Sequence, residues 1–382
     1  MREFDYDPTT RVVFGENSLD RLGQLASDLG GHRVLLVTDP GIVRAGHVER
    51  ARQALREAGL ECIVFDAVVE NPTTTVVERG RDFALDEGGI DFIVGLGGGS
   101  SMDAAKGVNF LLTNGGRMED YWGINKAKRP MLPSIGVPTT AGTGSEAQSF
   151  ALISQPDTHE KMACGDRKAR FRAVILDPVL TASMPADVAS VTAMDAISHA
   201  VESYVSSKSN HVSRMFAREA WRLLESNFSL SLHVPQDMEA RGRMLLGAHW
   251  AGAAIENSML GAAHACANPL TAHFDVTHGV AVSLMLPHVV RYNASVAGNE
   301  YHELVTAAGT PNGGPESSAD TLSERLAALR SLARLPSRLR EVNVGRDAFP
   351  ALAEDAARQW TGTFNPRRLG VQDAMELYER AF

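Results

Sequence analysis

The first half of the chain alternates short apolar runs with longer amphipathic stretches. The run Val34-Leu35-Leu36-Val37-Thr38 has almost no polar position, which is typical of a strand buried on both faces of a parallel sheet. We predict strands at 34–38, 60–65 and 91–96 and at the apolar start of 132–153, and helices at about 43–58 and 73–87. This strand–helix alternation predicts a parallel, doubly wound sheet.

Beyond Pro185 the apolar positions recur at helical spacing, and no run has the character of a buried strand. We predict helices at about 212–231, 240–260, 279–292, 318–334 and 371–381, and a surface loop at 311–315. A length of 382 residues is too great for one ordinary core. We therefore expect an α/β domain at residues 1–183 and a helical domain at residues 184–382.

The composition is that of a soluble globular protein, with 44% hydrophobic and 22% charged residues. A net charge of −9 without a long Lys/Arg run argues against a nucleic-acid-binding protein. We expect no membrane span, because no apolar run reaches about 18 residues. The N-terminus lacks the apolar core of a signal peptide. Three widely spaced cysteines allow no disulfide framework and indicate a reducing, cytoplasmic compartment.

A glycine-rich segment, Gly97-Gly98-Gly99-Ser100-Ser101, follows the third predicted strand directly. Glycines let the backbone approach a bulky anion, and the N-terminus of the next helix offers free N–H groups to a pyrophosphate. Either Ser100 or Ser101 could cap that helix. A plain tight turn is the alternative. The position between a buried strand and a helix favours dinucleotide binding.

Two further segments of the α/β half suit the same ligand. Asp39 ends the first predicted strand, where a carboxylate can bind a ribose hydroxyl and repel a 2′-phosphate, so it favours NAD over NADP. The alternative is a simple turn residue before Pro40. The stretch Thr139 to Glu146 is small, flexible and rich in hydrogen-bond donors, although it could also be an ordinary surface loop. Two such stretches in one domain favour a shared dinucleotide site.

One carboxylate and three imidazoles form a candidate metal site in the second half. Asp195 and His199 stand four residues apart, which places them on one helical face, and His264 and His278 follow further along the chain. This ligand set suits a divalent transition metal. For any single histidine among the twelve in the chain, a core or surface role is the usual explanation. Only the conjunction of the four residues favours a metal.

These motifs, in this order, strongly resemble the iron-containing (group III) alcohol dehydrogenase family. The resemblance is carried by Gly97 to Lys106, Pro138 to Glu146, Asp195 to Ala200 and the block from His264 to His278. It implies a dehydroquinate-synthase-like fold, with an N-terminal dinucleotide-binding α/β domain, an all-helical C-terminal domain and the active site between them.

The resemblance also implies site residues. The implied metal ligands are Asp195, His199, His264 and His278, with Fe(II) favoured and Zn(II) possible. The implied NAD-binding residues are Asp39, Gly97, Gly98, Ser100, Thr139, Thr140 and Thr143, with Asn71, Gln148 and Lys161 as weaker candidates. Phe150, Ile255 and Asn268 are expected to face the substrate.

The chain departs from the family at one position. Family members commonly carry a histidine four residues after the third ligand, where it can relay a proton, and Asn268 stands there instead. An amide can orient a substrate or water but is no general acid or base. His273 and Cys266 lie nearby in sequence and could compensate, although Cys266 is better explained as a small buried residue. We expect a changed proton path or a changed substrate preference.

The leading hypothesis is a metal-dependent, NAD(H)-linked alcohol dehydrogenase or aldehyde reductase, in which hydride transfer accompanies polarisation of the substrate oxygen by the metal. One alternative is an NAD-using lyase on a dehydroquinate-synthase-like scaffold, and another is a non-catalytic metal- or nucleotide-binding protein. The expected partners are a small alcohol or aldehyde and a second copy of the chain, with residues 2–14 as the edge strand that could pair.

Overall fold

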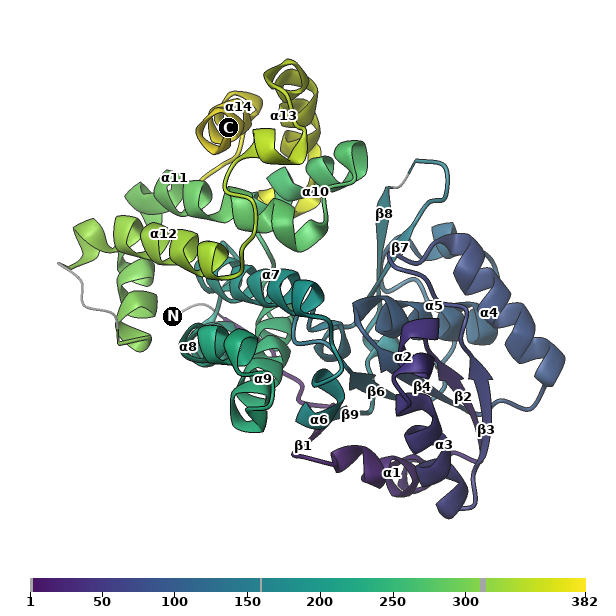
Figure 1. Ribbon diagram of the computed structural model, residues 1–382. Coiled ribbons are helices and arrows are strands. Elements are labelled where there is room, and N and C mark those ends of the chain that lie inside the picture. Colours follow the sequence, from purple (N-terminus) through teal and green to yellow (C-terminus); the bar gives the residue numbers. More distant parts are fainter. Residues whose placement is uncertain (1–2, 159, 310–313) are drawn as a thin grey trace. The chain divides into compact units, whose positions relative to one another are not determined.

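The computed structural model describes residues 3–158, 160–309 and 314–382, and it divides into two units (Figure 1). The α/β unit consists of Asp7–Thr140 and Gly144–Met184. The helical unit consists of Met1–Tyr6, Ala141–Thr143 and Pro185–Phe382. The predicted loop at 311–315 lies mostly outside the described residues.

In the described part of the α/β unit, six parallel strands form the main sheet (Figure 1). Their order across the sheet is β1 (Arg11–Phe14), β9 (Ala173–Leu176), β6 (Ser134–Pro138), β4 (Phe92–Gly97), β2 (Arg33–Val37) and β3 (Glu61–Phe65). The chain runs from β2 outward to β3 and then crosses back to β4 on the other side of β2. Ligands of doubly wound sheets bind at the carboxyl ends of strands where the order reverses in this way.

Both faces of this sheet are buried, which explains the uninterrupted apolar runs. Val34 and Leu36 join one core cluster with Leu22 and Leu55, which come from α1 (Leu22–Asp28) and α3 (His47–Glu57). On the other face Gly95 lies against α5 (Gly99–Asn114), which in turn packs on α4 (Thr74–Glu87). The predicted parallel, doubly wound sheet is thus confirmed.

Two local predictions in this unit need correction. The helix predicted at 43–58 is two helices, α2 (Pro40–Arg44) and α3, because Gly46 between them has a φ of 81° that breaks helical geometry. A second, three-stranded sheet was not predicted. It is formed by β5 (Gly123–Ile124), β8 (Lys161–Gly165) and β7 (Phe150–Ser154). In β7, Phe150 is half-buried and Leu152 exposed, so this strand lacks the two-sided burial of the main sheet.

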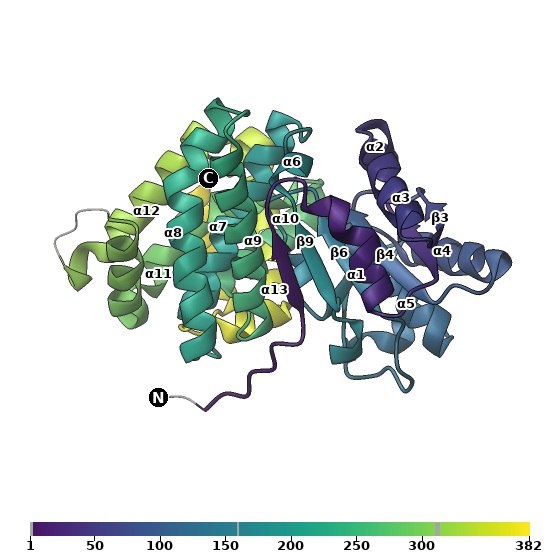
Figure 2. The ribbon, with the colours of Figure 1, turned by 90° about the horizontal axis from the view of Figure 1, so that it is seen from below.

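The helical unit is built on long helices, as the apolar periodicity predicts. They are α7 (Ala186–Val205), α8 (His211–His233), α9 (Met238–Glu256), α10 (Ala262–Phe274), α11 (His278–Ala307), α12 (Pro315–Leu332), α13 (Phe349–Arg358) and α14 (Val371–Ala381). Figure 2 shows α7, α8 and α9 side by side. Gly247 permits this close approach, because a Cβ atom there would lie 2.8 Å from Leu224 Cγ. The predicted helix 279–292 extends to Ala307, with a break in helical geometry at Ala297.

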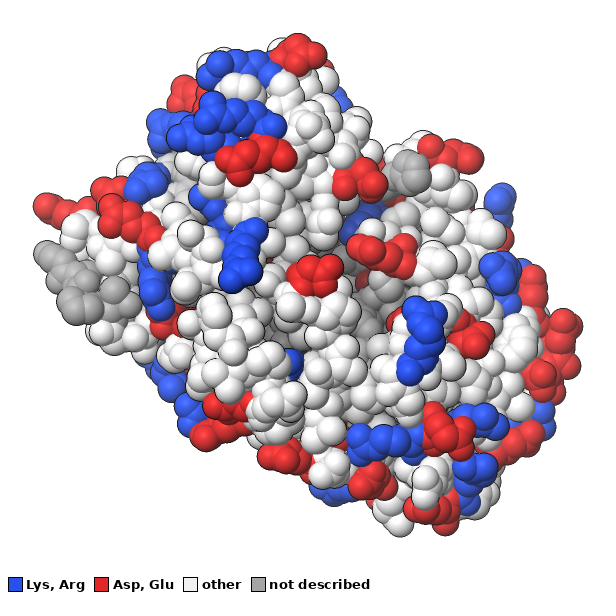
Figure 3. Space-filling model, viewed as in Figure 1, with Lys and Arg blue, Asp and Glu red and all other residues white. Residues whose placement is uncertain are grey.

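The surface agrees with the composition. On the face drawn in Figure 3, acidic and basic side chains are interspersed and leave no continuous basic surface. Of the helices in the described part of the chain, none combines the length and the apolar character that a bilayer span needs.

Candidate functional site

The four predicted metal ligands come together within the helical unit. Helix α7 supplies Asp195 and His199, α10 supplies His264, and His278 is the first residue of α11. Each imidazole directs Nε2 at Asp195 Oδ1, at 3.3 Å for His199, 3.6 Å for His264 and 3.8 Å for His278. Asp195 and His199 therefore lie on one face of α7, as their spacing of four residues predicts.

The buried polar atoms of this cluster fit a metal ion. Asp195 Oδ1 and His264 Nε2 are fully buried, and within the described structure neither has a hydrogen-bond partner. Buried polar atoms are almost always satisfied, so two unsatisfied atoms facing each other need an explanation. A divalent ion between them provides one, since one carboxylate oxygen and imidazole nitrogens are ordinary ligands of Fe(II) and Zn(II).

The electrostatics of the cluster also favour a cation. Burial would raise the pKa of Asp195, but His199, His278 and His264 hold that pKa well below its usual range. Burial would lower the pKa of His264, yet the carboxylates of Glu202 and Asp195 raise it to about 9. Two buried carboxylates thus give the site a preference for positive charge.

Glu202 is a buried neighbour of these ligands that the sequence analysis missed. It is 3% exposed, and its Oε2 accepts a hydrogen bond from His264 Nδ1 at 2.5 Å. The signal was available, because Glu202 follows His199 by three residues and so shares the helical face of both α7 ligands.

The candidate dinucleotide residues gather at the carboxyl ends of β2, β4 and β6. Ser101 Oγ donates to Asp39 Oδ2 at 3.2 Å, and the Thr139 amide donates to the Gly97 carbonyl at 2.9 Å. Gly97 has a φ of 147°, and a Cβ atom there would lie 2.4 Å from Ser101 Oγ. The structure therefore requires glycine at this turn, at the point where the strand order reverses.

The N-terminus of α5 begins at this turn. The predicted cap by Ser100 or Ser101 is wrong, because Gly98 is the N-cap and makes no side-chain cap. The helix starts so soon after β4 that both serines lie in its first turn. Ser100 Oγ instead accepts a hydrogen bond from the Asn71 amide at 3.2 Å. The first-turn N–H groups of α5 thus have no side-chain cap, as a phosphate-binding helix requires.

Two buried charged residues of α5, Lys106 and Asp103, form hydrogen bonds with Ser145 of the Thr139–Glu146 stretch. Lys106 Nζ, on a residue 2% exposed, donates to the Ser145 carbonyl at 2.7 Å, to Ser145 Oγ at 2.9 Å and to the Phe150 carbonyl at 2.7 Å. Ser145 Oγ donates to Asp103 Oδ1 at 2.6 Å. These bonds hold in place the loop that carries Thr139 and Thr140.

The structure also locates the cofactor candidate Thr143, the weaker cofactor candidates Gln148 and Lys161, and the substrate candidate Phe150. Gln148 Nε2 donates to the Gly144 carbonyl at 3.2 Å, and Lys161 begins β8 in the second sheet. The ring of Phe150 packs on Gly165, where a Cβ atom would lie 2.4 Å from Phe150 Cε1. Thr143 belongs to the segment Ala141–Thr143 of the helical unit. Their roles at a cofactor or substrate stay predictions.

The residues considered for proton transfer have structural partners. Asn268 Nδ2 donates to Gln359 Oε1 at 3.0 Å. His273 Nε2 lies 3.0 Å from Asp355 Oδ2 of α13, at hydrogen-bond distance, and its side chain is 54% exposed, so this contact is at the surface. Cys266 is fully buried, burial raises the pKa of its thiol, and it is the small core residue that the sequence favoured. Ile255 is 5% exposed on α9.

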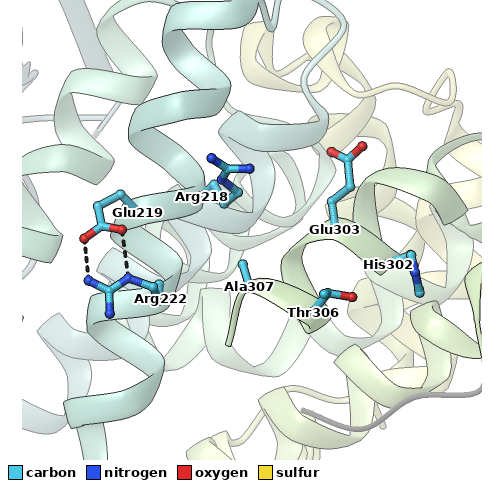
Figure 4. A pocket seen from close by; sticks show the side chains of 7 residues that line it. All are labelled: Arg218, Glu219, Arg222, His302, Glu303, Thr306 and Ala307. Atoms are coloured by element: carbon cyan, nitrogen blue, oxygen red, sulfur yellow. Dashed lines mark hydrogen bonds and ion pairs between the residues drawn. The ribbon is translucent and has the colours of Figure 1, made fainter. Parts of the chain in front are cut away.

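A surface pocket elsewhere in the helical unit is lined by α8 and the end of α11 (Figure 4). Its lining residues are Arg218, Glu219, Arg222, His302, Glu303, Thr306 and Ala307. Arg222 donates two hydrogen bonds to Glu219, at 2.8 and 2.6 Å, so part of its charge is neutralised within the wall. None of the four candidate metal ligands lines this pocket.

Two protein-family models match most of the chain. Residues 8–178 match the family described as iron-containing alcohol dehydrogenase, and residues 189–382 match the C-terminal region of the Fe-containing alcohol dehydrogenase family. The chain is 34% identical to a 1,3-propanediol dehydrogenase of Citrobacter freundii, with 100% of this chain and 99% of that protein covered.

Solved structures agree with these matches. A crystal structure of a 1,3-propanediol oxidoreductase has a TM-score of 0.96 at 33% identity, with 100% of both chains covered. A sulfoacetaldehyde reductase from Bifidobacterium kashiwanohense in complex with NAD⁺ has a TM-score of 0.90 at 25% identity, covering 100% of this chain and 99% of the other. The resemblance in the motifs and the fold class are therefore confirmed. The chain belongs to the iron-containing alcohol dehydrogenase family.

Proposed function

We propose that this chain is an NAD(H)-linked, metal-dependent oxidoreductase that interconverts a small alcohol with its aldehyde or ketone. The observation that carries the proposal is the convergence of three imidazole Nε2 atoms on Asp195 Oδ1, with Oδ1 and His264 Nε2 buried and lacking hydrogen bonds. The proposed ligands are Asp195, His199, His264 and His278, and the proposed ion is Fe(II), with Zn(II) as an ion that the same donors accept.

The residues of the candidate site determine how this alcohol–carbonyl interconversion would proceed. An ion held by this set would supply Lewis acidity toward an alcohol or carbonyl oxygen, while bound NAD⁺ would accept hydride from the carbinol carbon. Asp195 stays ionised in its buried position, because the neighbouring imidazoles hold its pKa low. The Asn268 amide donates a hydrogen bond to Gln359 and does not exchange a proton at neutral pH. We infer that the substrate proton leaves by a path that omits this side chain.

We propose that the α/β unit binds NAD in preference to NADP. The support is Asp39 at the carboxyl end of β2, next to the turn at Gly97. A carboxylate there accepts hydrogen bonds from ribose hydroxyls and repels a 2′-phosphate. Gly98, Ser100, Thr139 and Thr140 complete the proposed pyrophosphate-binding edge, with Asn71 behind Ser100.

The proposed substrates are short alcohols and aldehydes, with three-carbon hydroxy compounds first among them. The support is the full-length similarity to a 1,3-propanediol dehydrogenase. The lyase alternative predicts no net change in NADH, whereas the dehydrogenase predicts one hydride per turnover. Phe150, Ile255 and Asn268 remain the residues proposed to face the substrate.

The deciding experiment is an NADH-consumption screen over aldehydes and ketones, including 3-hydroxypropanal. Metal-free protein is reconstituted separately with Fe(II) and Zn(II), and His199→Ala serves as the metal-site variant. The exposed His233 on α8 provides a matched control, because His233→Ala removes an imidazole that belongs to no proposed site. Absence of turnover with either metal in the wild-type protein would defeat the proposal.

We further propose a homo-oligomer, in the simplest case a dimer, formed through β1. This strand is at the edge of the main sheet and pairs only with β9 in the described chain, and Val12 and Phe14 on it are 36% and 48% exposed. An open edge with exposed apolar side chains is a ready pairing surface. It is shorter than the strand expected at residues 2–14. The free cysteines Cys62, Cys164 and Cys266 support a cytoplasmic location.

A further inference from the structure

We infer that Glu202 is a positioning residue that fixes His264 for metal binding and joins this ligand to the start of its own helix. The inference rests on the proposed function, because it assigns Glu202 a role toward the metal held by His264. Both carboxylate oxygens are occupied. Oε2 accepts from His264 Nδ1 at 2.5 Å, and Oε1 accepts from the Ala263 amide at 2.6 Å.

The first contact decides which nitrogen of His264 faces the ion. With Nδ1 donating to Glu202, the other ring nitrogen, Nε2, is the one directed at Asp195 Oδ1. A carboxylate behind an imidazole fixes the ring orientation and makes the imidazole a stronger ligand. Glu202 is 3% exposed, so water does not compete for this hydrogen bond.

The second contact ties the same carboxylate to α10. The N-cap residue Gly261 makes no side-chain cap, and two side chains from elsewhere take that place. Asn365 Oδ1 accepts from the Ala262 amide at 3.2 Å, and Glu202 accepts from the next amide, that of Ala263. A Cβ atom on Gly261 would lie 2.9 Å from both Asn365 Oδ1 and Glu202 Oε1, so glycine allows both to approach.

An amide cannot replace the carboxylate here. Two donors, the Ala263 N–H and His264 Nδ1–H, point at residue 202. Glutamine has the same shape but a single acceptor oxygen. It must either leave one donor facing its own NH₂ group or force His264 into the tautomer with its proton on Nε2, which blocks the metal-binding nitrogen.

The test measures Co(II) binding to the full-length, metal-free chain by chelator competition and by the visible d–d spectrum. For Glu202→Gln we expect the dissociation constant for Co(II) to rise about 10- to 100-fold, the range found for partners behind metal ligands, with a changed spectrum. Two matched variants separate this effect from folding. Asn365→Ala removes the neighbouring helix cap without touching His264. Glu225→Gln neutralises another buried carboxylate, which is on α8 and pairs with Arg325 of α12, away from the helices that carry the candidate ligands.

Both controls should lower the melting temperature of the metal-free chain while keeping the wild-type Co(II) spectrum and an affinity within about threefold. Glu202→Asp keeps the charge and two acceptors, so it should recover part of the affinity lost in Glu202→Gln. If Glu202→Gln does not fold, the Glu202→Asp spectrum carries the test, and a spectrum identical to wild type overturns the inference.

Two outcomes separate the role of Glu202 from the existence of the metal centre. Failure of the wild-type chain to bind Co(II) at a site lost in His264→Ala would refute the metal centre itself. Wild-type binding together with an unchanged Co(II) affinity in Glu202→Gln would refute the role of Glu202 alone.

Discussion

Ser101 donates its hydroxyl hydrogen bond to Asp39 Oδ2, while Asp39 Oδ1 accepts from the amides of Gly41 and Ile42 at 2.8 and 3.1 Å. One carboxylate thus caps α2 and closes the turn after β4. Asp39 is the cap of a short helix, and we propose that its charge also selects the cofactor.

Asp39→Gly should therefore change cofactor preference. Hydrogen bonds to charged groups contribute about 1.5–3 kcal/mol, so kcat/KM with NADH should fall about ten- to a hundredfold, while activity with NADPH rises as the repulsion disappears. Asp39→Asn is the control, since it removes the charge but keeps an acceptor for the α2 amides. If both variants retain the wild-type ratio of NADH to NADPH activity, Asp39 does not select the cofactor.

Asn268→His should add a titratable group to the α10 segment that carries His264. We expect kcat/KM to acquire a new pH dependence near the ordinary imidazole pKa of about 6.5, because histidine can exchange a proton and asparagine cannot. The pH–rate profiles of the two proteins are compared for the best substrate of the screen. Gln359→Ala, which removes only the partner of Asn268, controls for the lost hydrogen bond. Superimposable profiles and an unchanged substrate ranking would show that this position has no part in the proton path.

Lys106→Met should destabilise the α/β unit strongly. The substitution keeps much of the side-chain volume but leaves Asp103 buried without its cation, and breaking such a pair costs about 3–5 kcal/mol. Burial already raises the pKa of Asp103, against the opposing effect of Lys106. Thermal unfolding is the measurement, and Lys106→Met combined with Asp103→Asn should restore part of the loss. The exposed pair of Arg56 and Glu49 is the comparison, since Arg56→Met should cost only about 0–1 kcal/mol. Equal losses in the two single variants would contradict this account.

His288 should make the helical unit sensitive to mild acid. Burial, together with Arg330 and Arg291, lowers its pKa from 6.5 to about 4. Between these values the unfolded chain binds a proton that the folded chain excludes, so this contribution to stability is complete above pH 6.5 and is lost as the pH falls toward 4. His288→Gln should reduce the fall in melting temperature of metal-free protein over that interval. A His288→Gln profile of melting temperature against pH that superimposes on the wild-type profile would contradict this role.

The main sheet and the long helices were predictable because burial on both faces leaves uninterrupted apolar runs and burial on one face leaves helical periodicity. The candidate metal ligands could be singled out from residue type and spacing, and the structure brings them together. Glu202 was missed although it shares a helical face with Asp195 and His199, because its partner His264 stands 62 residues further along the chain and the sequence does not show that the two side chains meet. The serine cap was misplaced because the number of residues between β4 and α5 is set by the turn at Gly97, which the sequence pattern leaves open.

The four candidate ligands all belong to one unit, and they come from α7, α10 and α11. A bound ion therefore acts as a cross-link between helices that are distant along the chain. Since an ion that binds only the folded state adds stability by mass action, metal loading should raise the unfolding temperature of the helical unit selectively. Loss of the ion would then weaken this unit as well as stop turnover, so metal supply would govern both the lifetime and the activity of the protein.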